Sequence, residues 1–397
     1  MALNLIRQLS LAAVNTSARE CLLNVPETKT SQLKNGFRIA SEDSGLPTCT
    51  VGVWIDAGSR YETDENNGVA HFFEHMCFKG TEKRTQQQLE LEVENMGAHM
   101  NAYTSREQTV YYAKCLSKDV DKAVEILADI LQNSKLGEAE IEREKHVILR
   151  EMEEIEQNLQ EVVFDHLHQA AYQGTPLART ILGPAENVRN MTRKHLVDYL
   201  QSHYKAPRMV LCAAGGVDHA HLVELAEKHF GQQSHKYPSS IPSVEGGIRF
   251  TGSEIKYRDD SMKFVYGCVA VEGVGWDHPD SIPLQIGNLL IGSWDRTQGS
   301  GMNSPTRLSQ KVGWGPEVQS YQSFATCYKD TGLWGVYFVS KCDAVDDFTK
   351  NMQDEWKHLC TTVTDEEVLR GKNLLKTQLL QSLDGTTPIC EDIGRSH

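Results

Sequence analysis

The order of strand-like and helix-like segments is the feature that most constrains the fold of this chain. Strand and helix signals mix without the steady strand–helix–strand repeat that a parallel sheet requires. The order therefore predicts an α+β fold, in which a largely antiparallel sheet is covered by helices. In the first half we expect strands at 51–55, 98–104, 108–115 and 207–214, and helices at 68–79, 85–96, 119–133 and across 138–170.

Local patterns carry these expectations. Asn35-Gly36 is a strong turn signal, which indicates a hairpin-like start to the sheet. Val51, Val53 and Ile55 alternate with their neighbours, as the residues of a strand do. In 119–133 the apolar residues instead recur at helical spacing.

A break in composition separates two halves. With 397 residues the chain is too long for one compact core, so two domains are the default expectation. Residues 231–248 are rich in glycine, serine and proline, as linkers are. We therefore expect a domain at 28–232, a linker at 233–248 and a second domain at 249–397. In the second half, strand signals occupy 263–271 and 333–340, and helix signals occupy 281–292, 345–359 and 364–382.

Composition and charge exclude some classes of function. The sequence has no apolar run of the roughly 20 residues that a transmembrane helix needs. A net charge of −14 argues against binding to nucleic acid, whose phosphates require a basic surface. The same charge suits a basic partner or substrate, although it can also serve solubility alone.

The first residues have a composition of their own. Met1 to Arg19 contains two arginines and several hydroxyl residues but no acid, and its apolar residues can coat one side of a helix. This is typical of a mitochondrial transit peptide, which we expect at 1–22. The alternatives are an unstructured terminus and a secretory signal. The secretory signal fits less well because Arg7, Gln8 and Ser10 interrupt its apolar segment.

The motif His71-Phe-Phe-Glu74-His75 carries the chemistry of the sequence. On a helix the two histidines lie one turn apart on one face, where both imidazoles can bind one Zn²⁺. Glu74 lies near the same face and can take a proton from an activated water. The alternative is a surface helix with two unrelated histidines. The apolar residues around the motif instead favour a helix packed into a core.

A catalytic zinc ion needs a third protein ligand. The acidic segment 138–170 offers many carboxylates, and most of them are expected on a solvated helix face. Spacing alone does not choose between them. The candidates are Glu142, Glu144, Glu151, Glu153, Glu154, Glu156 and Glu161.

The motif, followed by Glu151 in Val147-Ile-Leu-Arg-Glu151, resembles the inverted zinc motif of the pitrilysin/insulinase family. The resemblance runs from about Lys29 to Ser396. It implies two similar domains of the expected fold, the second of them incomplete at its C-terminal end. Supporting stretches include Asp56-Ala-Gly-Ser-Arg, Tyr204-Lys-Ala-Pro-Arg and Thr331-Gly-Leu-Trp-Gly.

The resemblance also implies a role for each matching residue. His71, His75 and Glu151 are expected to bind Zn²⁺, and Glu74 is expected to act as the general base. Glu144 lies seven residues before Glu151, on the same helical face, and matches a glutamate that supports the ligands.

The resemblance is closest to family members that remove basic presequences from proteins imported into mitochondria. It implies that Glu161 and Asp165, one helical turn apart, bind an arginine of the presequence. It places Asn101 and Ala102 on a strand that pairs with the extended peptide, and Phe78 against an aromatic residue after the cut. Read without the resemblance, the acids are an exposed helix face, Ala102 belongs to a sheet face and Phe78 to a core.

Partners and competing functions follow from the same resemblance. The expected enzyme is a zinc metalloendopeptidase of the mitochondrial matrix that works with a separate alpha subunit. One alternative is a structural core subunit of ubiquinol–cytochrome c reductase, which shares the fold and belongs to a respiratory complex. Such a subunit has no physical need for an intact metal motif. A broad oligopeptidase is a third possibility, against which the transit-like start argues.

Overall fold

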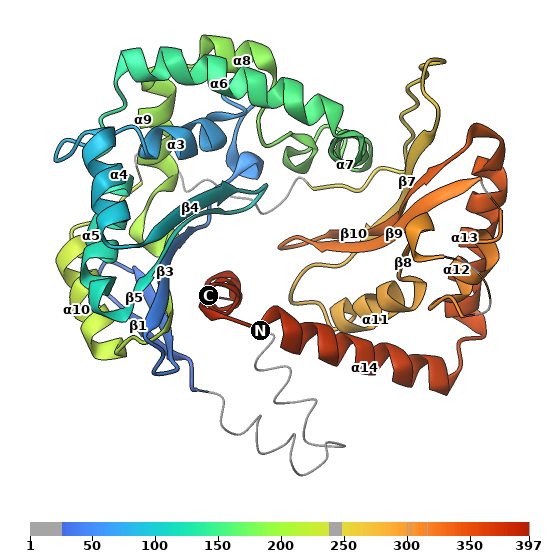
Figure 1. Cartoon of the computed structure of the whole chain (residues 1–397). Helices are drawn as coiled ribbons and strands as arrows, with labels where there is room; N and C mark the ends of the chain where they lie inside the picture. The colour runs from blue at the N-terminus through green and yellow to red at the C-terminus, as the bar shows by residue number, and fades with distance from the viewer. Residues whose placement is uncertain (1–25, 238–247, 300, 302, 316, 397) are drawn as a thin grey trace. The chain divides into compact units, whose positions relative to one another are not determined.

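The computed structural model describes residues 26–237, 248–299, 301, 303–315 and 317–396 (Figure 1). The expected transit peptide at 1–22 and residues 238–247 of the expected linker lie outside this range. The chain forms two compact units. The first takes the described residues of Met1–Glu153, Arg179–Gly247 and Leu379–His397, and the second takes Glu154–Ala178 and Ile248–Gln378. The units follow spatial contacts, so each includes a segment from the other half of the sequence.

The first unit is built on a six-stranded sheet with the order β1-β2-β6-β3-β5-β4. Its pairs are antiparallel except for β2 and β6, which run parallel. β4 is the edge strand on the side of β5. The strands are β1 (Lys29–Gln32), β2 (Arg38–Asp43), β3 (Thr48–Ile55), β4 (His99–Thr104), β5 (Thr109–Leu116) and β6 (Met209–Gly215).

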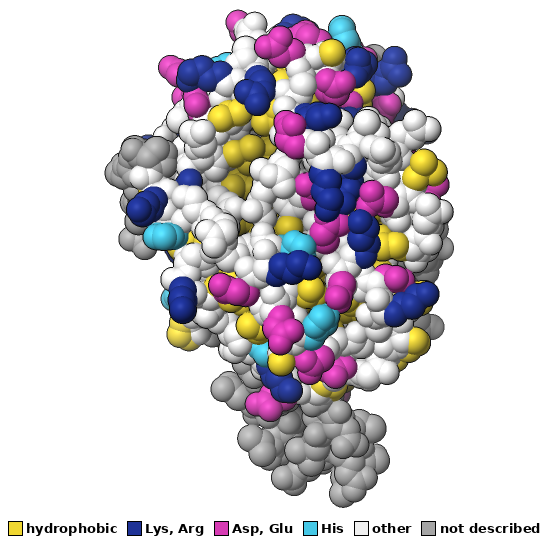
Figure 2. All heavy atoms as spheres, turned by 90° about the vertical axis from the view of Figure 1, so that its left-hand side faces the viewer, with side chains coloured by type: hydrophobic (Ala, Val, Ile, Leu, Met, Phe, Trp, Pro, Cys, Tyr) yellow, Lys and Arg dark blue, Asp and Glu magenta, His cyan; other side chains and the backbone are white. Residues whose placement is uncertain are grey.

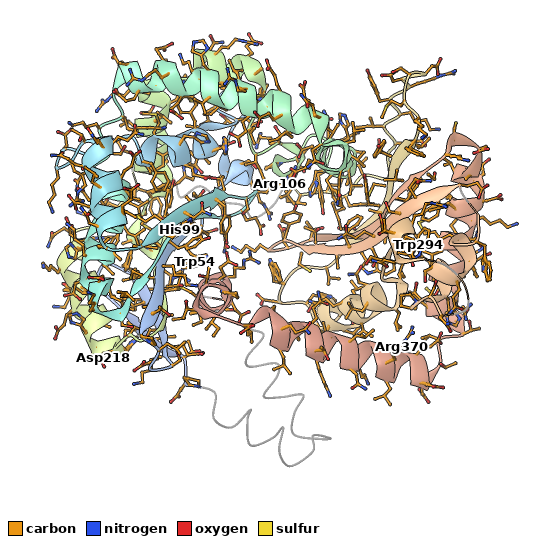
Figure 3. The ribbon with its side chains drawn as sticks, viewed as in Figure 1. Trp54, His99, Arg106, Asp218, Trp294 and Arg370 are labelled. Atoms are coloured by element: carbon orange, nitrogen blue, oxygen red, sulfur yellow. The ribbon has the colours of Figure 1, made fainter. Side chains whose placement is uncertain are left out.

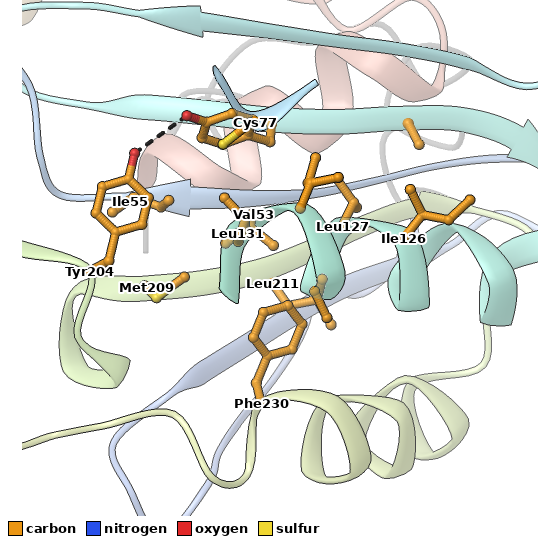
Figure 4. Packing of buried hydrophobic residues seen from close by; sticks show 14 of the residues in the cluster. Val53, Ile55, Cys77, Ile126, Leu127, Leu131, Tyr204, Met209, Leu211 and Phe230 are labelled. Carbon is orange, nitrogen blue, oxygen red and sulfur yellow. Dashed lines mark hydrogen bonds between the residues drawn. The ribbon is translucent and has the colours of Figure 1, made fainter. Parts of the chain in front are cut away.

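Helices cover the faces of this sheet. They are α3 (Val69–Cys77), α4 (Gln86–Asn95), α5 (Val120–Gln132), α8 (Ala185–Asn190), α9 (Arg193–His203), α10 (His219–Phe230) and α15 (Thr386–Ser396), with most of α6 (Glu138–Gln157). The main core lies between the sheet and α3, α5 and α10. Figure 4 labels ten of its residues: Val53, Ile55, Cys77, Ile126, Leu127, Leu131, Tyr204, Met209, Leu211 and Phe230. This core fixes α3, which carries the motif, against the sheet.

The opposite face of the same sheet is covered by α15. We call the apolar residues between them the outer cluster. Trp54 of β3 contacts the helix so closely that a Cβ on Gly394 would lie 2.2 Å from the indole ring (Figure 3). Thr50 and Thr386 join the two elements by a hydroxyl–hydroxyl hydrogen bond of 2.8 Å. The outer cluster consists of Ala40, Trp54, Val110, Val210, Cys212, Ala214, Cys390 and Ile393.

The second unit has a four-stranded antiparallel sheet with the order β7-β10-β9-β8. A separate apolar cluster around Trp294, Phe338 and Phe348 packs its helices on the sheet. Its elements are α7 (Leu159–Ala171), β7 (Val265–Gly273), α11 (Ser281–Ile291), β8 (Ser293–Asp295), α12 (Arg307–Val312), β9 (Val318–Cys327), β10 (Gly332–Ser340), α13 (Val345–Thr361) and most of α14 (Asp365–Ser382).

The predicted α+β class with largely antiparallel sheets is confirmed. One predicted element differs. The helical segment expected across 138–170 is two helices, because Asn158 adopts a non-helical conformation with φ −86° and ψ 87°. Asparagine competes for backbone hydrogen bonds through its side chain and therefore favours helix ends over interiors. None of the helices in the described residues has both the length and the apolar character needed to cross a bilayer.

Candidate metal centre

Helix α3 presents the motif from a rigid position. Its apolar residues Phe72, Phe73 and Met76 are fully buried in the main core. The opposite side of the helix carries His71, which is 7% exposed, together with the half-buried Glu74 and His75. Because the helix cannot rotate without exposing aromatic rings, the two imidazoles have a fixed direction.

A buried acid holds the N-terminus of α3. Gly68 begins the helix at φ +100°, where a Cβ would lie 2.4 Å from the carbonyl oxygen of Leu182, so only glycine fits. The Glu62 carboxylate accepts hydrogen bonds at 2.8 Å from the amides of Gly68 and Ala70, and one at 2.7 Å from the side chain of Asn67. Burial raises the pKa of Glu62, whereas these bonds oppose the shift. The acid thereby replaces the side-chain cap that Gly68 lacks.

Helix α6 brings Glu151 to the histidines. Its carboxylate oxygens lie 3.5 Å from Nε2 of His71 and 3.4 Å from Nε2 of His75. The three potential ligand atoms all lie within 4.8 Å of one another, and no other group of this kind occurs in the part of the chain that the structure describes. Hydrogen bonds, first from His71 and then from His75, lower the pKa of Glu151.

The chemistry of this donor set fits a catalytic metal site. Two imidazole nitrogens and one carboxylate form the His₂Glu set of catalytic zinc sites, in which water takes the fourth position. The alternative is that the carboxylate only accepts hydrogen bonds from the two imidazoles and that no metal is bound. The same three atoms can also bind one cation once each Nε2 has lost its proton, because all three lie within 4.8 Å of one another.

Glu144 supports His75 from the other side. It lies two helical turns before Glu151 on α6, and its Oε2 lies 3.1 Å from Nδ1 of His75. Its Oε1 forms an ion pair of 2.7 Å with Lys79, and its side chain is only 7% exposed. Burial lowers the pKa of His75, but the hydrogen bonds to Glu151 and Glu144 outweigh it and raise the pKa overall. Such a contact fixes which imidazole nitrogen faces the metal.

Glu74 points to a different partner from the three candidate ligands. The hydroxyl of Thr104, the last residue of β4, donates a hydrogen bond of 2.5 Å to Oε2 of Glu74. The other carboxylate oxygen has no hydrogen bond to the described residues in this arrangement. A carboxylate beside a metal, with one free oxygen, is suited to accept a proton.

The other predicted residues of the first unit lie on β4 and at the end of α3. Asn101 and Ala102 lie on the edge strand, where Oδ1 of Asn101 accepts a hydrogen bond of 2.9 Å from the amide of Ala102. Phe78 follows α3 and packs against the main core, with its ring centroid 6.3 Å from that of Tyr111. A core role for Phe78 is thus observed, and a substrate role is compatible with its partial exposure.

Glu161 and Asp165 lie one turn apart on α7, in the second unit. Glu161 is exposed, and its Oε1 accepts a hydrogen bond of 3.5 Å from the side chain of Asn158. The structure therefore keeps these two acids on one helix but assigns them to a different unit from the candidate ligands.

Sequence reasoning missed three residues of the site: Glu62, Lys79 and Thr104. Glu62 contacts the start of α3 from the preceding loop, and Lys79 contacts Glu144 on α6. Helical or strand spacing in the sequence does not predict either contact. For Thr104 a signal existed, because strand alternation puts it on the same side as Met100 and Ala102, toward the main core.

Charges of both signs are interspersed on one face of the first unit. The face of the first unit that carries α4, α5 and α10 mixes acidic and basic side chains (Figure 2). On this face Arg84 and Lys122 are paired with Glu125 and Glu92. The face offers no continuous positive surface for nucleic-acid phosphates.

Comparisons with known proteins cover nearly the whole chain. The family model described as insulinase, peptidase family M16, matches residues 38–185, and the model of the M16 inactive domain matches residues 190–375. The beta subunit of the mitochondrial-processing peptidase of Bos taurus is 62% identical over 379 residues, which are 96% of this chain and 77% of that protein.

Two further similar proteins are a subunit of the cytochrome b-c1 complex and a chain in a structure of complex III₂. Subunit 1 of the cytochrome b-c1 complex of Bos taurus is 52% identical over 392 residues, covering 99% of this chain and 82% of that protein. A chain in the solved structure of complex III₂ from Candida albicans, bound to Inz-5, superposes with a TM-score of 0.81 at 26% identity. The superposition covers 93% of this chain and 85% of that chain.

Proposed function

This chain belongs to the insulinase family of metallopeptidases, peptidase family M16, and within it we propose that the chain is the catalytic beta subunit of a mitochondrial processing peptidase. In this role it removes N-terminal targeting presequences from imported precursor proteins. The observation that carries the proposal is the convergence of His71, His75 and Glu151 beside Glu74. The 62% identity to a processing peptidase subunit supports the substrate class.

The family implies a divalent metal, and we propose Zn²⁺, held by His71, His75 and Glu151 of the inverted His-x-x-Glu-His motif. Zinc bound by two imidazoles and a carboxylate supplies Lewis acidity, which acidifies water and polarises a carbonyl group. Glu144 holds Nδ1 of His75 and so would leave Nε2 free to bind the metal.

Glu74 carries the proton transfers. Its free carboxylate oxygen takes a proton from the attacking water and later delivers it to the nitrogen of the leaving peptide. Its place next to His75 on α3 puts the carboxylate beside the candidate ligands but outside the ligand set. The buried Glu62 holds the first turn of the helix, so the positions of the histidines and of Glu74 relative to one another stay fixed.

Substrate recognition is proposed to use the chain's acidity and one open sheet edge. Glu161 and Asp165 bind an arginine of the presequence, because two carboxylates one turn apart can both accept from one guanidinium. Asn101 and Ala102 lie on the edge strand β4, where an extended peptide can add a strand. Phe78 then offers an apolar contact for the residue after the cut.

The proposal extends to partner and location. The partner is the alpha subunit of the mitochondrial processing peptidase, and the substrates are basic presequence peptides. The location is the mitochondrial matrix, to which a transit peptide at 1–22 would direct the chain. The peptidase domain is assigned to 28–232. It is followed by a linker at 233–248 and a second domain at 249–397.

A second candidate is the core subunit of the cytochrome b-c1 complex, favoured by the 52% identity to subunit 1. A structural role gives no physical reason to keep a base next to a three-atom ligand set, so the peptidase is the better supported function.

Reconstitution tests the proposal. The purified chain, mixed with its alpha subunit and zinc, should cleave a fluorescent basic presequence peptide at one bond, and a chelator should stop cleavage until zinc is restored. A chain that assembles into the cytochrome b-c1 complex and shows no cleavage with the alpha subunit would favour the structural candidate. The matched control is Glu82→Gln, an exposed acid seven residues beyond the motif.

A further inference from the structure

Glu74, the general base of the proposed reaction, has one hydrogen-bond partner among the described residues. Oγ1 of Thr104 donates to Oε2 of Glu74 at 2.5 Å, across 30 residues of sequence. Both side chains are partly buried, so the contact is shielded from solvent. A hydrogen bond to a carboxylate is among the stronger ones in proteins.

Strand alternation explains why Thr104 reaches the helix. Met100 and Ala102 of β4 pack against the main core, the side on which α3 lies. Tyr103, one residue along, packs instead against the outer cluster. Because side chains alternate, Thr104 points to the side of Met100 and Ala102, toward α3.

The hydrogen-bonding groups of the Thr104 backbone point away from β5, toward the open edge of the sheet. The amide of Ser105 bonds to the carbonyl of Gln108 within the hairpin, whereas the amide of Ala102 bonds to the side chain of Asn101. Alternate residues of β4 thus turn toward β5, and Ala102 and Thr104 turn toward the open edge. In Figure 3, His99 and Arg106 mark the two ends of this segment.

We propose that Thr104 is a positioning residue that couples the strand receiving the substrate to the general base. This inference rests on the proposed function. Thr104 holds one oxygen of Glu74 and leaves the other directed at water. Its backbone belongs to the edge with which the extended peptide pairs. A peptide that pairs with β4 is therefore also placed correctly relative to the Glu74 carboxylate, since Thr104 belongs to β4 and holds that carboxylate.

Thr104 neither gains nor loses a proton in this role. The hydroxyl keeps its hydrogen while Glu74 cycles between carboxylate and acid. The loss of the hydroxyl should let the Glu74 side chain change rotamer, which separates the base from the scissile bond. A misplacement of about 1 Å can cost about 100-fold in rate.

The test compares Thr104→Val, which removes the hydroxyl at nearly constant volume, with Thr104→Ser, which keeps it. Both are assayed as the zinc-loaded chain with its alpha subunit. Thr104→Val should lower kcat for a presequence peptide about 10- to 100-fold. KM and zinc content should remain within about twofold, and Thr104→Ser should keep kcat within about threefold. Thr50→Val, which removes a buried hydroxyl far along the sheet, is the control.

Crystal structures of the zinc-loaded wild type and Thr104→Val give a readout that does not need cleavage. The Glu74 carboxylate should keep its place in the wild type and move in the valine variant. An unmoved carboxylate, an unchanged kcat, or equal losses for valine and serine would each overturn the role of Thr104. Absence of cleavage by the wild type, with a Thr104-dependent Glu74 position, would instead overturn the proposed function and leave the positioning role intact.

Discussion

Glu144 lies 3.1 Å from Nδ1 of His75, and its second oxygen is held by Lys79. Glu144→Gln should weaken zinc binding about 10- to 100-fold, because the amide no longer fixes the imidazole by a charged hydrogen bond. Competition with a fluorescent chelator measures this affinity. Glu142→Gln is the matched control, since Glu142 is exposed on the same helix and pairs with Lys145. Equal affinity for Glu144→Gln and the wild type would contradict a supporting role.

Glu74→Gln should retain zinc and lose cleavage. Glutamine keeps the shape of the side chain and can still accept from Thr104, but it cannot take a proton. We expect kcat to fall by a factor of 10² or more, the usual contribution of a general base. Zinc content by atomic absorption and single-turnover cleavage with the alpha subunit separate binding from chemistry. Substantial turnover by Glu74→Gln would remove Glu74 from the base role.

The double variant Glu161→Ala/Asp165→Ala should affect arginine-containing presequences selectively. Loss of both carboxylates removes the partners of one guanidinium, so kcat/KM should fall about 10-fold or more for a peptide with arginine. For a matched peptide in which norleucine replaces that arginine, kcat/KM should differ little between the wild type and the double variant. Glu156→Ala, an exposed acid at the end of α6, is the control variant. An equal loss on both peptides would exclude the arginine contact.

His203 should make stability depend on pH. Burial, and then the charge of Arg208, lower the pKa of this histidine from 6.5 to about 4. The folded state therefore binds fewer protons than the unfolded state between these values. The stability from neutral His203 is complete above pH 6.5 and is lost as the pH falls toward 4, by about 3 kcal/mol in all.

The melting temperature of the metal-free chain between pH 7 and 4 measures this contribution. His203→Gln should flatten the decline, whereas His146→Gln, at an exposed histidine, should leave the slope of the wild type unchanged. Parallel slopes for the wild type and His203→Gln would show that His203 does not titrate in this window.

Patterns in the sequence predicted the helices and strands that depend only on neighbouring residues. The helix over His71 and His75 and the alternation of Val51, Val53 and Ile55 need only a few neighbouring residues, and both elements occur in the structure. The interruption at Asn158 escaped prediction, because the charged pattern of 138–170 continues through it.

Tertiary relationships could not be read from the sequence alone. Spacing left seven acids open as partners of the histidines, and only the path of α6 brings Glu151 within reach of both Nε2 atoms. Glu62 and Thr104 contact α3 from a loop and from a strand, so their partners follow from the packed fold and not from periodicity. The sequence pattern for 364–382 likewise did not reveal that the next helix, α15, covers the first sheet.

That helix affects how the protein folds during synthesis. Thr50 and Thr386 are hydrogen-bonded although 336 residues separate them. Until α15 leaves the ribosome, the apolar surface around Trp54 and Val210 has no cover. The first sheet can form before α15 is made, but its apolar outer side is then exposed while the remaining chain is translated. Because a late helix covers an early sheet, the first unit is complete only when nearly the whole chain has been translated.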